Sequence, residues 1–263
     1  CGEQTSGGVV FSYPGATYVV GGNYGQGVYA TERPECIGGW SEQGYVTDKL
    51  TDFEEMLGFD WVSLYNRASD SGGSWGYTGA SGNLQQISPG NIYTYDSYDE
   101  DAGEYIPLEG EYKLNGDGVA VVYVGDGDGV ANSPGDHLVI GNGDGTDETS
   151  FYNSNYNSEG VIIVVEGGVK VEMDIDRIDA FIISLGAFSG ETQSVIFPIT
   201  KYVSGDPLIV NGSLIGAEGF DVSRYIFDIY EPVLQIRHNS LYLDPVNITS
   251  LLLNANLSWM EVE

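Results

Sequence analysis

The sequence predicts an all-β protein whose second half is β-solenoid-like or β-helix-like, a stack of short parallel strands. Short runs of mostly β-branched residues recur from residue 106 onward, and each run is closed by Gly, Asn or Asp. Several runs are continuously apolar, which is typical of parallel strands that are buried on both faces. No helical pattern lies between the runs, so tight corners are expected to join the strands.

A β-sandwich is the alternative fold, because it also spaces short strands at intervals of about 8 to 12 residues. The uneven spacing of the runs in this chain leaves both architectures open. In the last run, Asn211 and Gly212 separate two apolar segments and are expected to form a corner with positive φ. The expected strands lie within 118–125, 137–141, 160–168, 169–175, 178–188, 194–199 and 207–216.

Two regions are predicted along the chain. Residues 1–105 form a loop-rich, aromatic-rich and Gly-rich β region, and residues 106–263 form the solenoid-like domain. The first region contains at most one short helix, at 51–58, where a Thr-x-x-Glu capping box precedes a closing glycine. The acidic stretch 95–104 is expected to be a solvated linker.

The charge of the chain restricts its partners and its location. The 263 residues include 39 acidic and 9 basic side chains, a formal net charge of −30. Such a field repels nucleic acid and anionic membranes, so neither is an expected partner. Abundant Gly and Tyr with few basic residues are typical of secreted β structure, and no apolar stretch is long enough for a transmembrane segment. We therefore expect an extracellular or cell-surface protein.

The cysteines fit the same compartment, whereas the glycosylation sequons count for little because about two are expected by chance from this composition. Cys1 and Cys36 either form a disulfide with each other, or Cys1 carries lipid as the first residue of a processed lipoprotein. Three sequons of the N-x-S/T type occur, at Asn211, Asn247 and Asn256.

Repeated Asp-Gly and Asn-Gly pairs between residues 115 and 145 indicate either a calcium site or turns between strands. In an EF-hand frame that uses Asp126 and Asp128, Val124 occupies the first ligand position and Gly135 the last. An intact EF-hand is therefore not expected, and turns are the favoured interpretation. The alternative is an irregular Ca²⁺ site shared between neighbouring corners. Its candidate ligands are Asp126, Asp128, Asp136, Asp144 and Asp147.

No pattern in the sequence singles out a catalytic group, and a non-enzymatic protein is expected. The sequence contains no GxSxG, HExxH or CxxC motif. His137 and His238 are too few for a typical zinc site and are expected at strand ends. Arg177 is expected to pair with a neighbouring acid, Asp174, Asp176 or Asp179.

Several short motifs follow one another in a fixed order within residues 160–263. They are Ile178-Asp179-Ala180, Leu208 to Ile215, Arg224, Glu231-Pro232 running to Tyr242-Leu243, Trp259, Glu261 and Val262. In this order they resemble the C-terminal region of pilus-associated or surface β-helix-like proteins of uncultivated small-genome bacteria. The chain departs from that family at His238, at Asp221 and in the lack of an N-terminal pilin-like helix.

This resemblance implies a non-enzymatic subunit of a filament, pilus or surface layer, assembled through exposed β-strands. The expected partner is another copy of the chain or a pilin-like subunit. The alternative function is a secreted carbohydrate-binding or polysaccharide-degrading protein, in which aromatic residues such as Trp40 and Trp75 stack on sugars.

Overall fold

The computed structural model describes most of the chain between residues 61 and 243. The described ranges are 9–13, 16–20, 61–70, 73–78, 82–142, 149–198, 208–222, 234–237 and 239–243. Strands dominate these ranges, and one α-helix accompanies them, α3 (Trp61–Asp70). The predicted all-β class is therefore confirmed. The helix expected at 51–58, both cysteines, His238, Asn247 and Asn256 lie outside the described residues.

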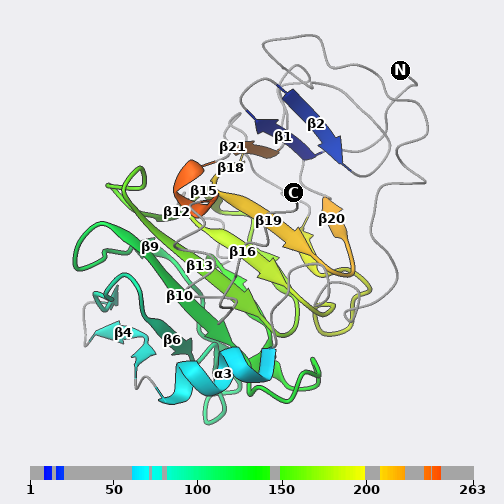
Figure 1. Cartoon of the computed structure of the whole chain (residues 1–263). Helices are drawn as coiled ribbons and strands as arrows, with labels where there is room; N and C mark the ends of the chain where they lie inside the picture. Colours follow the sequence, from blue (N-terminus) through cyan, green and yellow to red (C-terminus); the bar gives the residue numbers. More distant parts are fainter. Residues whose placement is uncertain are drawn as a thin grey trace, which may run out of the picture.

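Three sheets make up the body of the described chain (Figure 1). Sheet I has six strands, in the order β19 (Ser213–Gly216), β16 (Phe181–Ser184), β13 (Glu159–Val165), β10 (Gly118–Val124), β6 (Ile92–Tyr95) and β3 (Ser74–Trp75). Sheet II consists of β11 (Leu138–Ile140), β14 (Val169–Val171), β17 (Val195–Phe197) and β20 (Phe220–Val222). Sheet III has seven strands, in the order β2 (Ala16–Val20), β1 (Val9–Tyr13), β21 (Leu234–Arg237), β18 (Leu208–Asn211), β15 (Ile175–Ile178), β12 (Thr149–Tyr152) and β9 (Gly110–Glu111).

The chain visits the three sheets repeatedly in the same order. Strands β10, β11 and β12 lie in sheets I, II and III, and the same holds for β13–β14–β15, β16–β17–β18 and β19–β20–β21. We call each such set of three strands a level. All neighbouring strands within the three sheets are parallel except β1 and β2.

Antiparallel pairing, on which a β-sandwich depends, is rare among the described strands. Besides β1 and β2, it occurs only in two short hairpins. These are β4 (Tyr77–Thr78) with β5 (Asn83–Leu84), and β7 (Tyr98–Asp99) with β8 (Glu104–Tyr105).

One hydrophobic core is shared by the three sheets, because equivalent side chains align from level to level. In sheet III, Phe151 pairs with Ile178, Ile178 with Val210, and Val210 with Ile236. All four side chains are buried and belong to one cluster with the inward residues of sheets I and II. This vertical register buries apolar surface at every level, which is the main stabilising contribution of such a core.

Sheet I is also buried on its outer face, as its continuously apolar sequences predict. In β10, Ala120 and Val122 point into the shared core, whereas Val121 and Tyr123 belong to a second cluster on the outside. Helix α3 covers this outer face next to β6 and β10 (Figure 1), and the 3₁₀ helix η3 (Ser240–Leu243) covers it next to β13. Successive residues of one strand therefore alternate between two apolar surfaces, the shared core on one face and the outer cluster on the other.

The core and the sheets continue across the boundary predicted at residue 105. Strand β6 pairs with β10, and Trp75 and Tyr95 lie in the same cluster as Val122. The stretch 95–104, predicted to be a solvated linker, contains most of the β7–β8 hairpin instead. Ser97 within it is buried and donates a hydrogen bond to the Gly135 carbonyl at 2.9 Å.

The corner predicted at Asn211-Gly212 is present between β18 and β19, but its geometry differs from the prediction. Gly212 does not adopt a positive φ. A glycine is needed there because a Cβ atom would lie 2.0 Å from the carbonyl oxygen of Ala180 on the neighbouring level. This position requires glycine because two backbones approach closely there, and not because the residue adopts a left-handed conformation.

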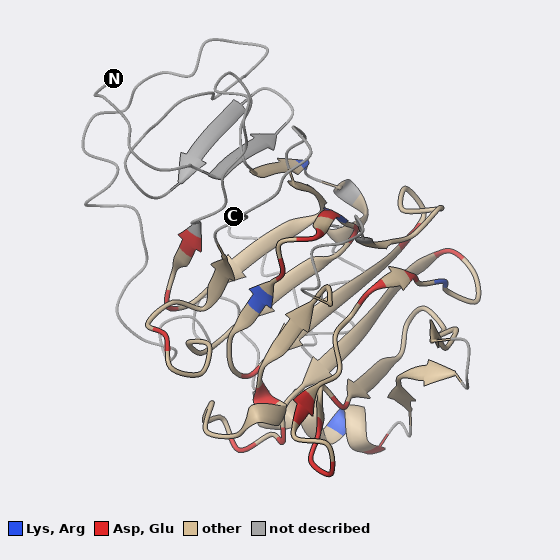
Figure 2. Ribbon diagram, turned by 180° about the vertical axis from the view of Figure 1, so that it is seen from behind, with Lys and Arg blue, Asp and Glu red and all other residues tan. Residues whose placement is uncertain are grey.

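Acidic side chains lie mostly in the loops and at strand ends, as Figure 2 shows. Among the described residues, no helix has the length and apolar character needed to span a membrane.

Candidate metal centre

The DGDG stretch after β10 is a series of turns, as its sequence predicts. Gly125, Gly127 and Gly129 all have positive φ, with values of 136°, 82° and 77°. Side-chain oxygens of the intervening aspartates support the turns. Asp126 Oδ1 accepts from the Asp128 amide at 3.0 Å, and Asp128 Oδ1 accepts from the Val130 amide at 2.7 Å.

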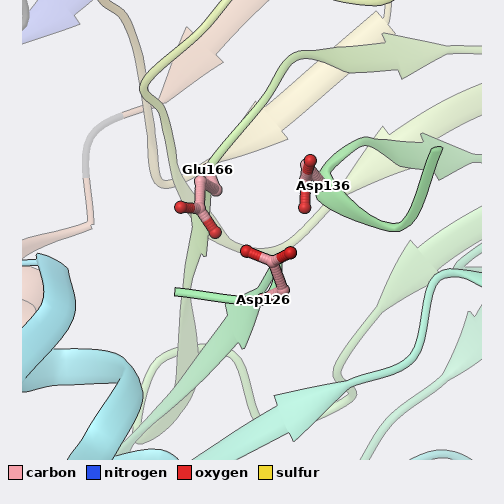
Figure 3. A group of neighbouring side chains, drawn as sticks. All are labelled: Asp126, Asp136 and Glu166. Atoms are coloured by element: carbon pink, nitrogen blue, oxygen red, sulfur yellow. The ribbon is translucent and has the colours of Figure 1, made fainter. Parts of the chain in front are cut away.

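Three carboxylates from two successive levels converge at the corner between sheets I and II. Asp126 follows β10, Asp136 ends the 3₁₀ helix η2 (Pro134–Asp136), and Glu166 follows β13. One carboxylate oxygen of each lies within 4.8 Å of the others. Figure 3 shows the three side chains pointing toward one another. Asp136 and Glu166 are buried, and Asp126 is exposed, so the group opens to solvent on one side.

Asp136 is the most enclosed member of the group and is fully buried. Its Oδ2 atom accepts hydrogen bonds from the amides of Asn132 at 3.0 Å and Ser133 at 2.7 Å, which closes the loop before β11. Its Oδ1 atom is buried without a hydrogen-bond partner. A buried carboxylate oxygen without a hydrogen bond lowers the stability of the fold, so a bound ion or donor at this atom would be favourable.

Glu166 is hydrogen-bonded to the DGDG loop of the preceding level. Its two carboxylate oxygens accept hydrogen bonds from the Gly127 amide at 2.9 Å and from the Gly129 amide. The side chain fits because its neighbour across the ladder is Gly125, where a Cβ atom would lie 2.2 Å from Glu166 Oε2. Glycine is favoured at this position both by the glutamate side chain and by the positive φ of the backbone.

The electrostatics of the group favour a bound positive charge. Burial raises the pKa of Glu166, the amides of Gly127 and Gly129 oppose the rise, and the charges of Asp136 and Asp126 add to it. The Tyr123 hydroxyl is also buried without a well-formed hydrogen bond. Burial raises the pKa of Tyr123, and the charges of Glu166, Asp136 and Asp126 raise it further.

The structure brings together two of the five predicted calcium ligands, Asp126 and Asp136. Asp128 is exposed and lies outside the group, where its Oδ2 accepts from the side-chain Nδ2 of Asn132 at 3.1 Å. Asp144 and Asp147 lie outside the described residues. Glu166 was missed by the sequence analysis. The available signal was a single carboxylate placed directly after the apolar run of β13.

A second polar group lies at the corner between sheets III and I. Fully buried Asp179 pairs with Arg177 through two bonds, from Nε at 2.9 Å and from Nη2 at 2.6 Å, which confirms the predicted ion pair. Asp179 also accepts from the side-chain Nδ2 of Asn211 at 2.7 Å and from the backbone N–H of Asn153 at 2.9 Å. Every bond of this carboxylate is thus made within the fold, which is typical of a structural network.

The contacts of Asn211 in this polar group affect whether its sequon could be glycosylated. Its side chain is buried, and its amide nitrogen is the atom that donates to Asp179. A glycan would replace one of the two hydrogens on this nitrogen and would need space in the corner, where the side chain is buried.

His137 lies just before β11, as expected of a strand-end residue. It is buried, and its Nδ1 accepts a hydrogen bond from the Gly168 amide at 3.0 Å. Burial lowers the pKa of His137, and the charge of Asp136 opposes this.

These features define a strand-rich protein with three parallel sheets and an all-carboxylate group at one corner. Comparison with protein-family models, curated proteins and solved structures finds no match for the chain.

Proposed function

We propose that the chain is a β-solenoid and serves as a non-enzymatic structural subunit of a filament, pilus or surface layer outside the cell. The observation that carries the proposal is the repeated visit to sheets I, II and III, which stacks strands in one direction. Such a stack exposes backbone hydrogen-bonding groups only at its two ends.

The two ends differ among the described residues. At the first end, the hairpins β4–β5 and β7–β8 adjoin an aromatic group formed by Trp75, Tyr95, Tyr112 and Phe151. The Trp75 indole donates to the Gln85 carbonyl at 2.8 Å, and the Tyr95 hydroxyl donates to the Ile106 carbonyl at 3.1 Å. These bonds tie the adjoining segments to the aromatic group, which supports the proposal that this end of the stack is capped.

At the other end, β19 and β20 are the last described strands of sheets I and II, and each pairs with one described neighbour. We propose that assembly occurs here, by addition of a strand from a second copy or from a pilin-like subunit. In this proposal the first end of the stack is closed to further strands, and a partner pairs only with β19 and β20 at the other end.

The surface charge is compatible with an assembly outside the cell. Acidic side chains in the loops surround the sheets, and the chain carries a net charge of −30. Repulsion between subunits would be screened by salt or by divalent cations, so assembly should strengthen as ionic strength rises.

The position of Trp75 does not support the alternative function, in which this side chain stacks on sugars. This side chain is 1% exposed and packs against Tyr95, Tyr112 and Phe151, so neither face of its indole is open to a ligand. Trp40 lies outside the described residues.

The role of β19 as the assembly contact can be tested by placing a charged side chain on this strand. The variant Ile215→Lys places a lysine on β19, where natural edge strands use this residue to prevent pairing. Electron microscopy and light scattering of the full chain should show assemblies for the original sequence and their loss in the variant. Val62→Lys is the control for an added charge, because Val62 is 47% exposed on α3, away from β19. Ile215 packs against the outer cluster of sheet I, so the melting temperature of Ile215→Lys must stay close to that of the original chain for the comparison to count.

Persistence of assemblies in Ile215→Lys would exclude β19 as the contact. A chain that stays monomeric in moderate salt with millimolar calcium, both alone and with candidate surface subunits, would overturn the proposed function.

A further inference from the structure

We propose that Asp126, Asp136 and Glu166 bind a Ca²⁺ ion that ties two successive levels of the stack together. The proposal concerns a site within one chain, so it stands whether or not the chain assembles. It differs from the site expected from sequence because one ligand, Glu166, comes from the next level and Asp128 takes no part.

The first argument is convergence. The loop 125–136 and the turn after β13 are distant in sequence, yet they place three carboxylate oxygens within 4.8 Å of one another. Like charges at this separation repel, and hydrogen bonds from loop amides relieve only part of the repulsion. A dication between the three oxygens would replace repulsion with attraction.

The second argument is independent of the first and rests on atoms without partners. Asp136 is fully buried and points into the group, and its Oδ1 has no hydrogen-bond donor. The buried Tyr123 hydroxyl lies beside Glu166 and the other two charges and has no well-formed hydrogen bond. A bound cation would satisfy the carboxylate oxygen directly, and a water on that cation would satisfy the hydroxyl.

The chemistry of the donors selects the ion. The group consists of carboxylates alone, and hard oxygen donors favour Ca²⁺, Mg²⁺ or Mn²⁺ over zinc or copper. Magnesium demands nearly ideal octahedral geometry, whereas calcium accepts six to eight oxygens in irregular arrangements. An irregular loop with one exposed ligand, which leaves room for water, fits calcium best.

The bound ion would have a structural consequence. Asp126 and Asp136 bracket the loop that connects β10 to β11, and Glu166 lies at the start of the turn that connects β13 to β14. Binding would therefore fix one corner on two levels at once, and it would stabilise the folded chain by mass action.

Calorimetric titration with CaCl₂ of the full chain, first stripped with a chelator, tests the site. The buffer should contain about 150 mM NaCl, which screens diffuse binding to the acidic surface. We expect one saturable site and a rise of several degrees in the melting temperature, reversed by EGTA. Asp126→Asn should weaken Ca²⁺ binding by about tenfold or more, because affinity follows the number of ligand charges.

Asp128→Asn is the matched control. Asp126 and Asp128 are both exposed, lie two residues apart, and make the same type of side-chain bond to the loop backbone. The control should bind Ca²⁺ like the original chain. Asp136→Asn, which keeps the size and an acceptor oxygen of the side chain, should abolish the saturable site.

Three outcomes would overturn the proposal. The first is equal weakening by Asp126→Asn and Asp128→Asn, which would show diffuse binding. The second is unchanged binding in Asp136→Asn. The third is no calcium-dependent shift in melting temperature.

Discussion

At the scale of single residues, the sheets are held in register by positions where two levels approach closely. Gly212 and Gly125 both face atoms of a neighbouring level that would lie within about 2.2 Å of an added Cβ. Gly125 makes room for Glu166, and Gly212 makes room for the backbone of Ala180. A side chain can move away from such a contact, but a backbone within a sheet cannot.

The variant Gly212→Ala tests this distinction. The new methyl group would lie 2.0 Å from the Ala180 carbonyl oxygen, so β18 and β19 must shift away from β16. We expect a loss of about 1 to 3 kcal/mol or more in the free energy of unfolding, measured by denaturant titration. Gly76→Ala is the control, because no atom lies within 4 Å of its added Cβ, and it should be nearly neutral. Equal stability of the two variants would contradict the close approach at Gly212.

At the scale of elements, α3 stabilises sheet I from outside and was not expected from the sequence. Its apolar positions Leu64, Tyr65 and Ala68 follow a helical spacing, and Arg67 in the last turn suits the helix dipole. Leu64 and Ala68 are almost fully buried against the outer cluster of sheet I. The signal was short and lay among turn residues, so the periodicity did not stand out.

The variant Leu64→Ala measures what the helix contributes. Removing a side chain that is 1% exposed should lower the free energy of unfolding by about 2 to 5 kcal/mol. Val62→Ala on the same helix should change it by less than about 0.5 kcal/mol, because Val62 is 47% exposed. Hydrogen exchange should report faster opening of α3 in the first variant alone. If both variants behave alike, the helix does not pack on the sheet as described.

At the scale of the whole molecule, buried tyrosines make the fold sensitive to alkaline pH. Burial raises the pKa of Tyr77 to about 12, and the charge of Glu109 adds to the rise. Burial also raises the pKa of Tyr95 and Tyr112 well above the usual range. Because the unfolded chain releases these protons near pH 10, each tyrosine stabilises the fold fully below that pH. The contribution of Tyr77 is lost as the pH rises from about 10 to about 12, and the contributions of Tyr95 and Tyr112 continue to fall at still higher pH.

An alkaline titration followed at 295 nm and by circular dichroism would check this expectation. A subset of tyrosines should ionise late and together with the loss of the β-sheet signal. In Tyr112→Phe, fewer tyrosines should ionise with that late transition, because the fully buried hydroxyl is gone. Ionisation of every tyrosine near pH 10 with the sheet signal intact would contradict the buried aromatic core.

The candidate site was predictable only in part. The Asp-Gly pairs marked the corner and supplied Asp126 and Asp136, because turn chemistry is encoded in a few neighbouring residues. Glu166 could not be assigned in this way, because its neighbours in space depend on the register between β10 and β13. That register is a property of two strands separated by a whole level of the chain.

By itself the sequence determined the strand-rich class, the positions of most strands in the second half, the turns and the acidic character of the surface. These follow from local periodicity and composition, which act over a few residues. Only the tertiary structure decided that β3 and β6 belong to the same core as the second half, why Gly212 must be a glycine, and which carboxylates meet. Those outcomes depend on which strands lie side by side, and pairing between distant segments is set by packing of the whole chain.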